Sequence, residues 1–215
     1  MAKSVPLDEG HVIVVPANEA AWEDLRLVFG TRGDPATCQC QWFKIRSAEW
    51  QAVPVEEKRN RLREQTGCDN PHALSTSGLV AYLEGEPVGW VAVEPRTRYL
   101  ARMERARVVW AGRDEDKADE SVWAVTCFVV RTGYRHRGIA RALTEAAVEH
   151  ARRNHARAVE AYPIATEPGE NVPWGQLYIG SVRMFEHAGF EPVTSPTPRR
   201  RVMRMNFEQT GDHAS

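Results

Sequence analysis

The fold is decided by one segment near the middle of the chain, Cys127-Phe128-Val129-Val130-Arg131-Thr132-Gly133-Tyr134-Arg135-His136-Arg137-Gly138-Ile139-Ala140. Its apolar beginning continues a run that starts at Val122, which is typical of a central strand buried on both faces. Polar residues follow, and an amphipathic pattern from Gly138 to Asn154 predicts a helix. The segment therefore predicts a strand, a short turn and the beginning of a helix.

The turn of this segment has the properties of a receptor for a phosphate or pyrophosphate group. The first backbone N–H groups of a helix have no intrahelical partner, and the helix dipole adds partial positive charge there. Gly138 has no side chain to keep an anion away from the backbone, and Ala140 keeps the next contact small. Arg135 and Arg137 add charge, as does His136 when protonated. The spacing matches neither the dinucleotide-binding nor the P-loop pattern. The alternative interpretation is a strand–turn–helix joint with a solvated basic corner.

Periodicity and turn residues predict the other elements of the chain. Strands are expected at 11–15, 79–83, 88–93, 122–130, 158–162, 190–193 and 201–207, and helices at 18–29, 47–65, 96–109, 138–154 and 178–188. Pro54 can start a second segment within the helix at 47–65. Loops are expected at 30–35, 67–77, 112–120 and 163–175. This order predicts an α+β fold with helices packed on a mixed, mostly antiparallel sheet. We expect one domain over 1–208 and a frayed tail over 209–215.

Composition argues against several classes of partner. The 28 Lys and Arg residues are balanced by 29 Asp and Glu, which gives no general attraction to nucleic acid or to an anionic membrane. The basic patches at 152–153 and 199–201 are too short to favour a nucleic-acid binder. No run approaches the ~18 apolar residues of a spanning helix, and residues 1–10 carry no apolar signal core. A cytoplasmic location is therefore expected.

The four cysteines are expected to be reduced thiols. Cys38 and Cys40 have the spacing of a metal half-site, but no second close pair of Cys or His is visible, so no metal is expected. The favoured interpretation is a buried turn with Cys40 and Trp42 on one face.

Three stretches of the chain together resemble the GNAT superfamily of N-acetyltransferases. Residues 135–140 resemble its acyl-CoA pyrophosphate signature. Glu84-Gly85-Glu86-Pro87-Val88-Gly89-Trp90 looks like its hairpin before the central strand, and Met184-Phe185-Glu186-His187-Ala188-Gly189-Phe190 is similar to its last helix-to-strand joint. The stretches occur in the family's order and span 79–207, whereas the N-terminal third matches only in its strand–helix–helix plan. The resemblance implies a GNAT-like (acyl-CoA N-acyltransferase) fold and acetyl-CoA as co-substrate.

The resemblance also implies which residues bind the co-substrate. In the family, the strand before the signature splays from its neighbour and pairs with the pantetheine arm, so the backbone of Phe128 and Val130 is expected to bind that arm. The amides from His136 to Arg141 are expected to bind the pyrophosphate. The full expected set is Phe128, Val129, Val130, Arg135, His136, Arg137, Gly138, Ile139, Ala140 and Arg141.

The implied reaction is direct attack of an amine on the thioester. The favoured acceptor is the primary amine of a small molecule, because the long loop over 163–175 favours a covered pocket. A protein or peptide acceptor and a non-catalytic acyl-CoA-binding module remain as alternatives. Pairing of the C-terminal strands offers a route to a homodimer.

The acid that protonates the leaving thiolate is not obvious from the resemblance. Many family members carry a tyrosine where this chain has Phe185, which cannot donate a proton. Tyr178, about two helical turns earlier, is the first candidate to replace it, and Ser181, one turn earlier, is the second.

Candidates for the base are Glu160 in a strand and Glu167 or Glu170 in the long loop. Cys127 as a covalent nucleophile is disfavoured, because no histidine neighbours it in the sequence. The stretch 38–43 is expected to wall the acceptor pocket. Its aromatic residues Trp42 and Phe43 either hold an apolar part of the substrate or anchor the loop in the core.

Overall fold

The computed structural model describes residues 3–7, 10–166 and 172–208 of the chain. Within these ranges an eight-stranded sheet has the order β1-β2-β3-β4-β5-β6-β8-β7. The strands are β1 (Lys3–Leu7), β2 (Gly10–Pro16), β3 (Gly78–Leu83), β4 (Glu86–Pro95), β5 (Val122–Val130), β6 (Ala158–Ala161), β7 (Glu191–Thr197) and β8 (Arg200–Asn206). β5 and β6 are parallel and the other neighbours antiparallel. The predicted mixed, mostly antiparallel sheet is confirmed.

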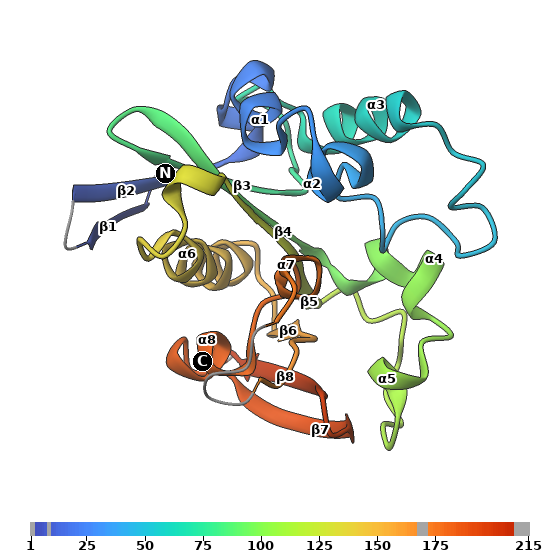
Figure 1. Ribbon diagram of the computed structural model, residues 1–215. Coiled ribbons are helices and arrows are strands. Elements are labelled where there is room, and N and C mark those ends of the chain that lie inside the picture. The colour runs from blue at the N-terminus through green and yellow to red at the C-terminus, as the bar shows by residue number, and fades with distance from the viewer. Residues whose placement is uncertain (1–2, 8–9, 167–171, 209–215) are drawn as a thin grey trace, which may run out of the picture.

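Helices cover both faces of this sheet. They are α1 (Trp22–Phe29), α2 (Gly33–Cys38), α3 (Val55–Thr66), α4 (Leu100–Met103), α5 (Arg107–Trp110), α6 (Ile139–Arg153), α7 (Trp174–Leu177) and α8 (Val182–His187), with 3-10 turns η1 (Ala17–Glu19), η2 (Arg96–Tyr99) and η3 (Thr132–Tyr134). Figure 1 shows α6 beneath the strands β2 to β4, and α1 and α3 above them. None of the helices in the described ranges is long and apolar enough to cross a membrane.

The central strand β4 is buried on both faces because a separate core forms on each side of it. Val91 and Val93 point to the core under α6, where Leu143 of that helix packs. Trp90 and Ala92 point to the opposite core, with α1 and α3. Side chains alternate along a strand, so a continuous apolar run serves two cores at once.

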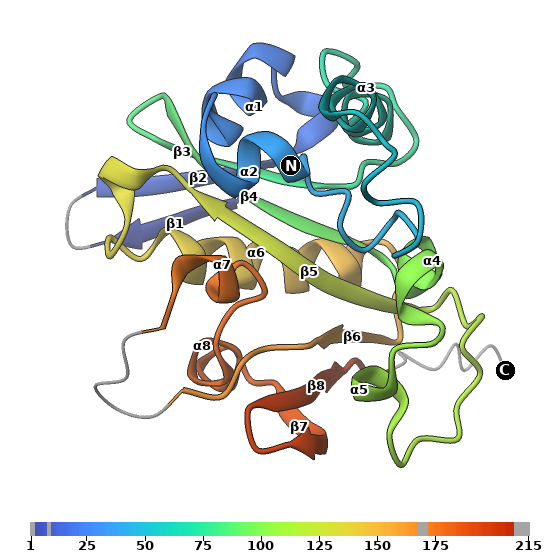
Figure 2. The same ribbon diagram turned by 45° about the vertical axis from the view of Figure 1, so that its right-hand side comes forward.

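The sheet opens beside β5, and this opening positions the site. β5 pairs with β6 only from Val122 to Val125, so from Thr126 to Val130 it is paired with β4 on one edge and with no described strand on the other. On the other side, Ala92 pairs with Cys127 and Val93 with Val125, so a β-bulge accommodates the residue between them. In Figure 2, α7 lies in the opening between β5 and the C-terminal elements α8, β7 and β8.

The structure corrects several predicted element boundaries. The stretch 47–53 forms turns, and α3 begins only after Pro54, which is its N-cap. The single helix expected over 96–109 is instead η2, α4 and α5. Residues 30–35 were expected only to break the first helix, but α2 begins among them at Gly33. The helix expected over 178–188 begins at Val182.

The last correction changes the geometry of the expected acid. Gly180 has φ of +77°, which ends the turn after α7, and Ser181 then caps α8. A Cβ on Gly180 would lie 2.7 Å from the Phe185 ring, so the close approach also requires glycine. Tyr178 and Phe185 are therefore not two turns of one helix, and the register argument that placed them on one face is wrong.

Candidate active site

The turn that the sequence predicts as an anion receptor lies at the beginning of α6. His136 has φ of +62° and Gly138 has φ of +75°, so the backbone reverses twice before the helix starts. The first intrahelical bond runs from the amide of Ala142 to the carbonyl of Gly138. The amides of Ile139, Ala140 and Arg141 therefore lack intrahelical partners, as a phosphate group requires.

A cavity of about 390 Å³ lies over these amides. Most of the expected cofactor-binding residues line it: Phe128, Val130, Arg135, His136, Gly138, Ile139, Ala140 and Arg141. Val129 instead pairs with Trp90 of β4, and its side chain lines a different cavity. Arg137 is exposed, and its guanidinium lies 5.8 Å from the centre of the Tyr134 ring. We call the 390 Å³ space the cofactor cavity.

Two backbone groups on the open edge of β5 already have protein partners. The N–H of Phe128 donates to the carbonyl oxygen of Tyr178 at 2.6 Å. The carbonyl oxygen of Val130 accepts a bond from Nε of Arg135 at 3.3 Å. A pantetheine arm that paired with β5 as predicted would have to displace both bonds, and so would move the chain around Tyr178.

A second cavity, of about 620 Å³, lies on the other side of Tyr178, and we call it the acceptor cavity. Aromatic residues supply much of its wall: Phe29, Trp42, Phe43, Trp50, Tyr162 and Tyr178. Trp42 and Trp50 meet edge to face at 5.0 Å, and Trp42 is 45% exposed. Cys38 and Gly175 line the same cavity, so the 38–43 stretch and the described end of the long loop both border it.

Tyr178 lines both cavities and therefore stands where they meet. Burial, and then the carboxylate of Asp34, raise the pKa of its phenol, while Arg135 acts in the opposite direction. A phenol with a raised pKa keeps its proton at neutral pH and can donate it. Phe185, by contrast, is fully buried, and its ring centre lies 6.0 Å from that of Phe128 and 5.0 Å from that of Phe190.

Ser181, the other candidate acid, lines only the cofactor cavity. Its hydroxyl oxygen accepts a bond from the amide of Met184 at 3.4 Å, which caps α8. The cap leaves the hydroxyl proton available, so a bond from Ser181 to a ligand in the cofactor cavity is compatible with it.

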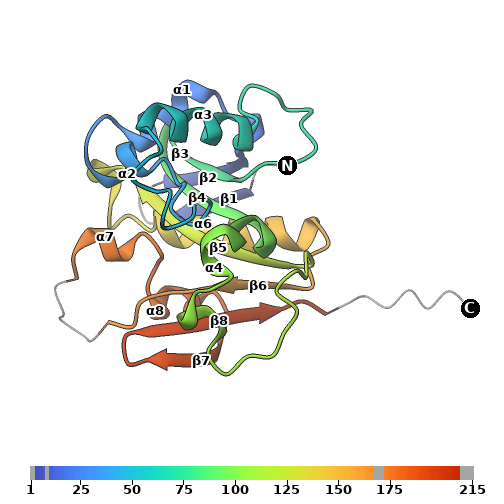
Figure 3. The same ribbon diagram turned by 90° about the vertical axis from the view of Figure 1, so that its right-hand side faces the viewer.

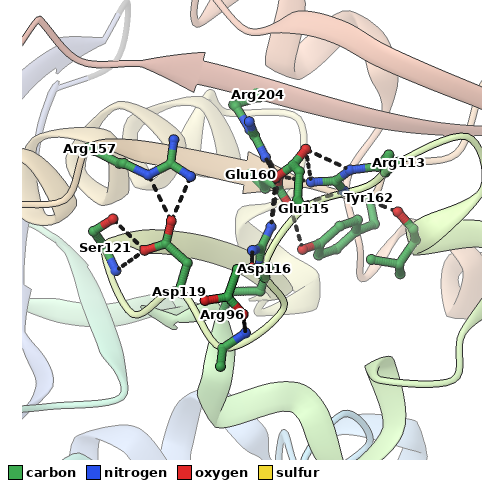
Figure 4. Close-up of polar contacts among 12 residues, drawn as sticks. Arg96, Arg113, Glu115, Asp116, Asp119, Ser121, Arg157, Glu160, Tyr162 and Arg204 are labelled. Atoms are coloured by element: carbon green, nitrogen blue, oxygen red, sulfur yellow. Dashed lines mark hydrogen bonds and ion pairs between the residues drawn. The ribbon is translucent and has the colours of Figure 1, made fainter.

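Glu160 is placed in a buried ionic network instead of in either cavity. Figure 4 shows its carboxylate among the guanidinium groups of Arg96, Arg113 and Arg204, with the hydroxyl of Tyr162 donating to it at 2.8 Å. Burial favours a higher pKa for Glu160, but the neighbouring arginines outweigh it and lower the pKa. Glu160 is fully buried, so the expectation that it is a base is corrected to a structural role. Glu167 and Glu170 lie outside the described residues.

The thiols of Cys127 and Cys38, which line the acceptor cavity, have raised pKa values and are unsuited to nucleophilic attack. A hydrogen bond to Cys40, and then burial, raise the pKa of Cys127. Burial and the nearby Cys40 raise the pKa of Cys38 to about 11. The indole N–H of Trp90 donates to the Cys40 sulfur at 3.3 Å. In the part of the chain that the structure describes, no group of three or more His, Cys, Asp and Glu side chains could hold a metal.

Two charged residues of the acceptor cavity, Asp34 and Arg200, were missed from the sequence. Asp34 lies in the stretch expected only to break a helix, and Arg200 in a basic run weighed only as a patch for nucleic acid. No sequence signal marked either one, because they are far apart in the chain and only the fold brings them to one cavity.

Comparisons with known proteins agree with this geometry. The GNAT domain of PAT from S. lividans is 17% identical, with a TM-score of 0.51 over 96% of this chain and 97% of that chain. A GNAT-family acetyltransferase from Listeria monocytogenes is 10% identical, with a TM-score of 0.54 over 95% of this chain and 100% of that chain. At such identities the likeness shows the fold. A search of curated proteins finds no significant match.

The match to a protein family goes further than the likeness in fold. Residues 41–190 match the family described as Acetyltransferase (GNAT) family. This stretch contains β3 to β6, the anion receptor and both candidate acids. The chain belongs to the acetyltransferase (GNAT) family.

Proposed function

We propose that this protein transfers the acetyl group of acetyl-CoA to the primary amine of a small molecule. The observation that carries the proposal is the position of Tyr178, which lines both the cofactor cavity and the acceptor cavity. A thioester reaching from the first cavity meets an amine held in the second only at this residue.

The cofactor cavity fits the phosphates and arm of acetyl-CoA. The amides of Ile139, Ala140 and Arg141 would hold the pyrophosphate, supported by the positive charge of Arg135 and Arg141. Gly138 adopts a positive φ that L side chains rarely adopt, so the backbone reversal that exposes these amides depends on glycine. When bound, acetyl-CoA supplies the activated acetyl group.

The chain's own residues then manage the protons of the transfer. The amine nitrogen forms a bond to the acetyl carbon, and the bond from that carbon to sulfur breaks. The phenol of Tyr178 donates its proton to the departing sulfur, and the amine loses a proton to water or to a nearby carboxylate. The raised pKa of Tyr178 keeps that proton in place before the reaction.

The size of the acceptor cavity favours a small molecule over a protein. Its volume of about 620 Å³ is in the usual range for small-ligand pockets, roughly 300–1,000 Å³. Its wall is drawn from α2, from the strand β5 and from residues 175–179. A protein acceptor would need an open groove to admit a peptide.

A screen tests the proposal. A panel of primary amines and N-terminal peptides is incubated with acetyl-CoA, and free thiol release is measured. Release with small amines and not with peptides is expected. Release only with peptides would reassign the acceptor. Tight binding of acetyl-CoA in calorimetry with no release from any member would favour a binding module.

A further inference from the structure

Two residues of opposite charge line the acceptor cavity, and neither has a side-chain partner among the described residues. Among the described residues that line it, Asp34 is the only acidic one and Arg200 the only basic one. No hydrogen bond or ion pair joins either side chain to another described residue, nor do the two pair with each other. Asp34 is exposed and Arg200 is partly buried, so water solvates both charges and each is accessible to a ligand group of opposite sign.

Asp34 lies beside the point where the two cavities meet. It is in the first turn of α2, and its Oδ2 is 3.2 Å from where a Cβ on Gly175 would stand. Its negative charge raises the pKa of the Tyr178 phenol. An ammonium group drawn into this largely apolar cavity would find its counter-charge at Asp34, next to the proposed acid.

Arg200 belongs to a different wall of the cavity. It is the first residue of β8 and forms a bridge with Ile164, and it is partly buried. Figure 2 and Figure 3 both show α2 on one side of β5 and the β7–β8 hairpin on the other. The two charges therefore approach the cavity from opposite sides.

The wall of the cavity suits a flat apolar body. The side chains of Trp42, Phe43, Trp50 and Tyr162 line it together with Val108 and Val109. A long polycation would bring several charges to a wall with one carboxylate, and would leave the others buried without partners.

We propose that the acceptor is a zwitterion, in which a primary amine is joined through an aromatic or similarly flat apolar body to an anionic group. Asp34 binds the ammonium and Arg200 binds the anion. This inference rests on the proposed function, because it names the substrate class of the same cavity.

Calorimetry tests the inference without any turnover. The probes are 4-(aminomethyl)benzoate and its longer homologue 4-(3-aminopropyl)benzoate, each matched with the amine that has a methyl group in place of the carboxylate. A charge-assisted pair to Arg200 predicts that at least one carboxylate probe binds about 10- to 100-fold more tightly than its matched amine.

Variants assign the preference to the two side chains. Arg200→Gln should abolish the preference while leaving the affinity of the matched amine unchanged, and Arg200→Lys should retain part of it. Asp34→Asn should weaken both probes about tenfold or more. Arg46→Gln and Asp114→Asn, at exposed sites, are the matched controls and should change neither affinity. Thermal melts verify that each variant is folded.

Equal binding of the carboxylate probes and their matched amines would overturn the inference, as would a preference that survives in Arg200→Gln. In L-phenylalanine the ammonium and the carboxylate are attached to the same carbon. If it bound more tightly than both carboxylate probes, the placement of Asp34 and Arg200 on opposite walls would be refuted. Thiol release that is equal with both kinds of probe would preserve the proposed function and reject this inference. A binding preference for the carboxylate probes without thiol release from any amine would support the ligand class inferred here and reject the proposed acetyl transfer.

Discussion

Replacing Glu160 with Gln should destabilise the fold strongly, because the change removes the charge at the centre of a buried network while retaining its shape. The carboxylate is fully buried and forms ion pairs with Arg96, Arg113 and Arg204, which are 0%, 1% and 12% exposed at their side chains. In the variant, Glu115 remains the carboxylate that is ion-paired with these three guanidinium groups. Removing one partner of a buried ion pair costs about 3–5 kcal/mol.

This loss of folding free energy should be measurable as a decrease in the melting temperature. For a chain of this length each kcal/mol shifts Tm by about 2–4 °C, so Glu160→Gln should lower Tm by about 6–20 °C. The assay is thermal unfolding followed by circular dichroism at pH 7, with urea unfolding as a second measure.

The matched control is Glu149→Gln on α6. Glu149 also pairs with two arginines, Arg152 and Arg153, but those side chains are about half exposed. Exposed pairs contribute about 0–1 kcal/mol, so the control should shift Tm by no more than a few degrees. A Glu160→Gln shift as small as that of the control would refute the structural role assigned to Glu160.

The pH dependence of this difference has a definite sign. The pKa of Glu160 is lower in the folded protein than its ordinary value, so its contribution is present above the unfolded pKa and is lost as pH falls through the folded pKa. The gap in stability between the wild type and Glu160→Gln should therefore narrow below about pH 4. A gap that widens in acid would contradict this reasoning.

Three further predictions concern the cavities and α6. Tyr178→Phe should lower kcat about 10²-fold or more with little change in the affinity for acetyl-CoA, whereas a change below a few-fold would assign the proton to water. Gly138→Val should weaken acetyl-CoA binding in calorimetry, because valine strains the positive φ of the receptor. Gly133→Val is its control, because a Cβ there meets no atom within 4 Å, and equal losses in both variants would reject the receptor. Burial, and then Arg153, lower the pKa of His150 to about 4, so the unfolded chain takes up the proton first and stability should fall by about 2–3 kcal/mol from pH 7 to pH 4. Urea unfolding should show that this loss is reduced in His150→Gln, and an unchanged slope would show that His150 is not its source.

The strongest sequence patterns predicted their elements well because the signals are local. The helix expected over 138–154 is observed as Ile139–Arg153, and the strand expected over 122–130 has those bounds. A long amphipathic repeat and a continuous apolar run each require burial of a defined face, whatever the rest of the chain does. The anion receptor follows from the same stretch, since its amides belong to the first turn of that helix.

Elements whose form depends on distant partners were predicted less well. Residues 96–109 have helical spacing, but the chain breaks into η2, α4 and α5, with the Arg96 side chain buried against Glu160 of β6. Glu160 itself looked like an available base, because nothing in the sequence shows that three arginines surround it. Each of these ion pairs joins residues that are more than 40 positions apart in the chain.

The sequence by itself determined the class of fold and the family, and it predicted the place where an anionic co-substrate would bind, because these depend on short-range periodicity, local motifs and one helix terminus. Only the tertiary structure decided what surrounds the transferred group. The opening between β5 and β6, the junction of two cavities at Tyr178, and the presence of Asp34 and Arg200 at one cavity arise when strands and loops from both halves of the chain pack together. A cavity is the space that packed side chains leave between them, so its shape and charge follow from long-range contacts that no local pattern encodes.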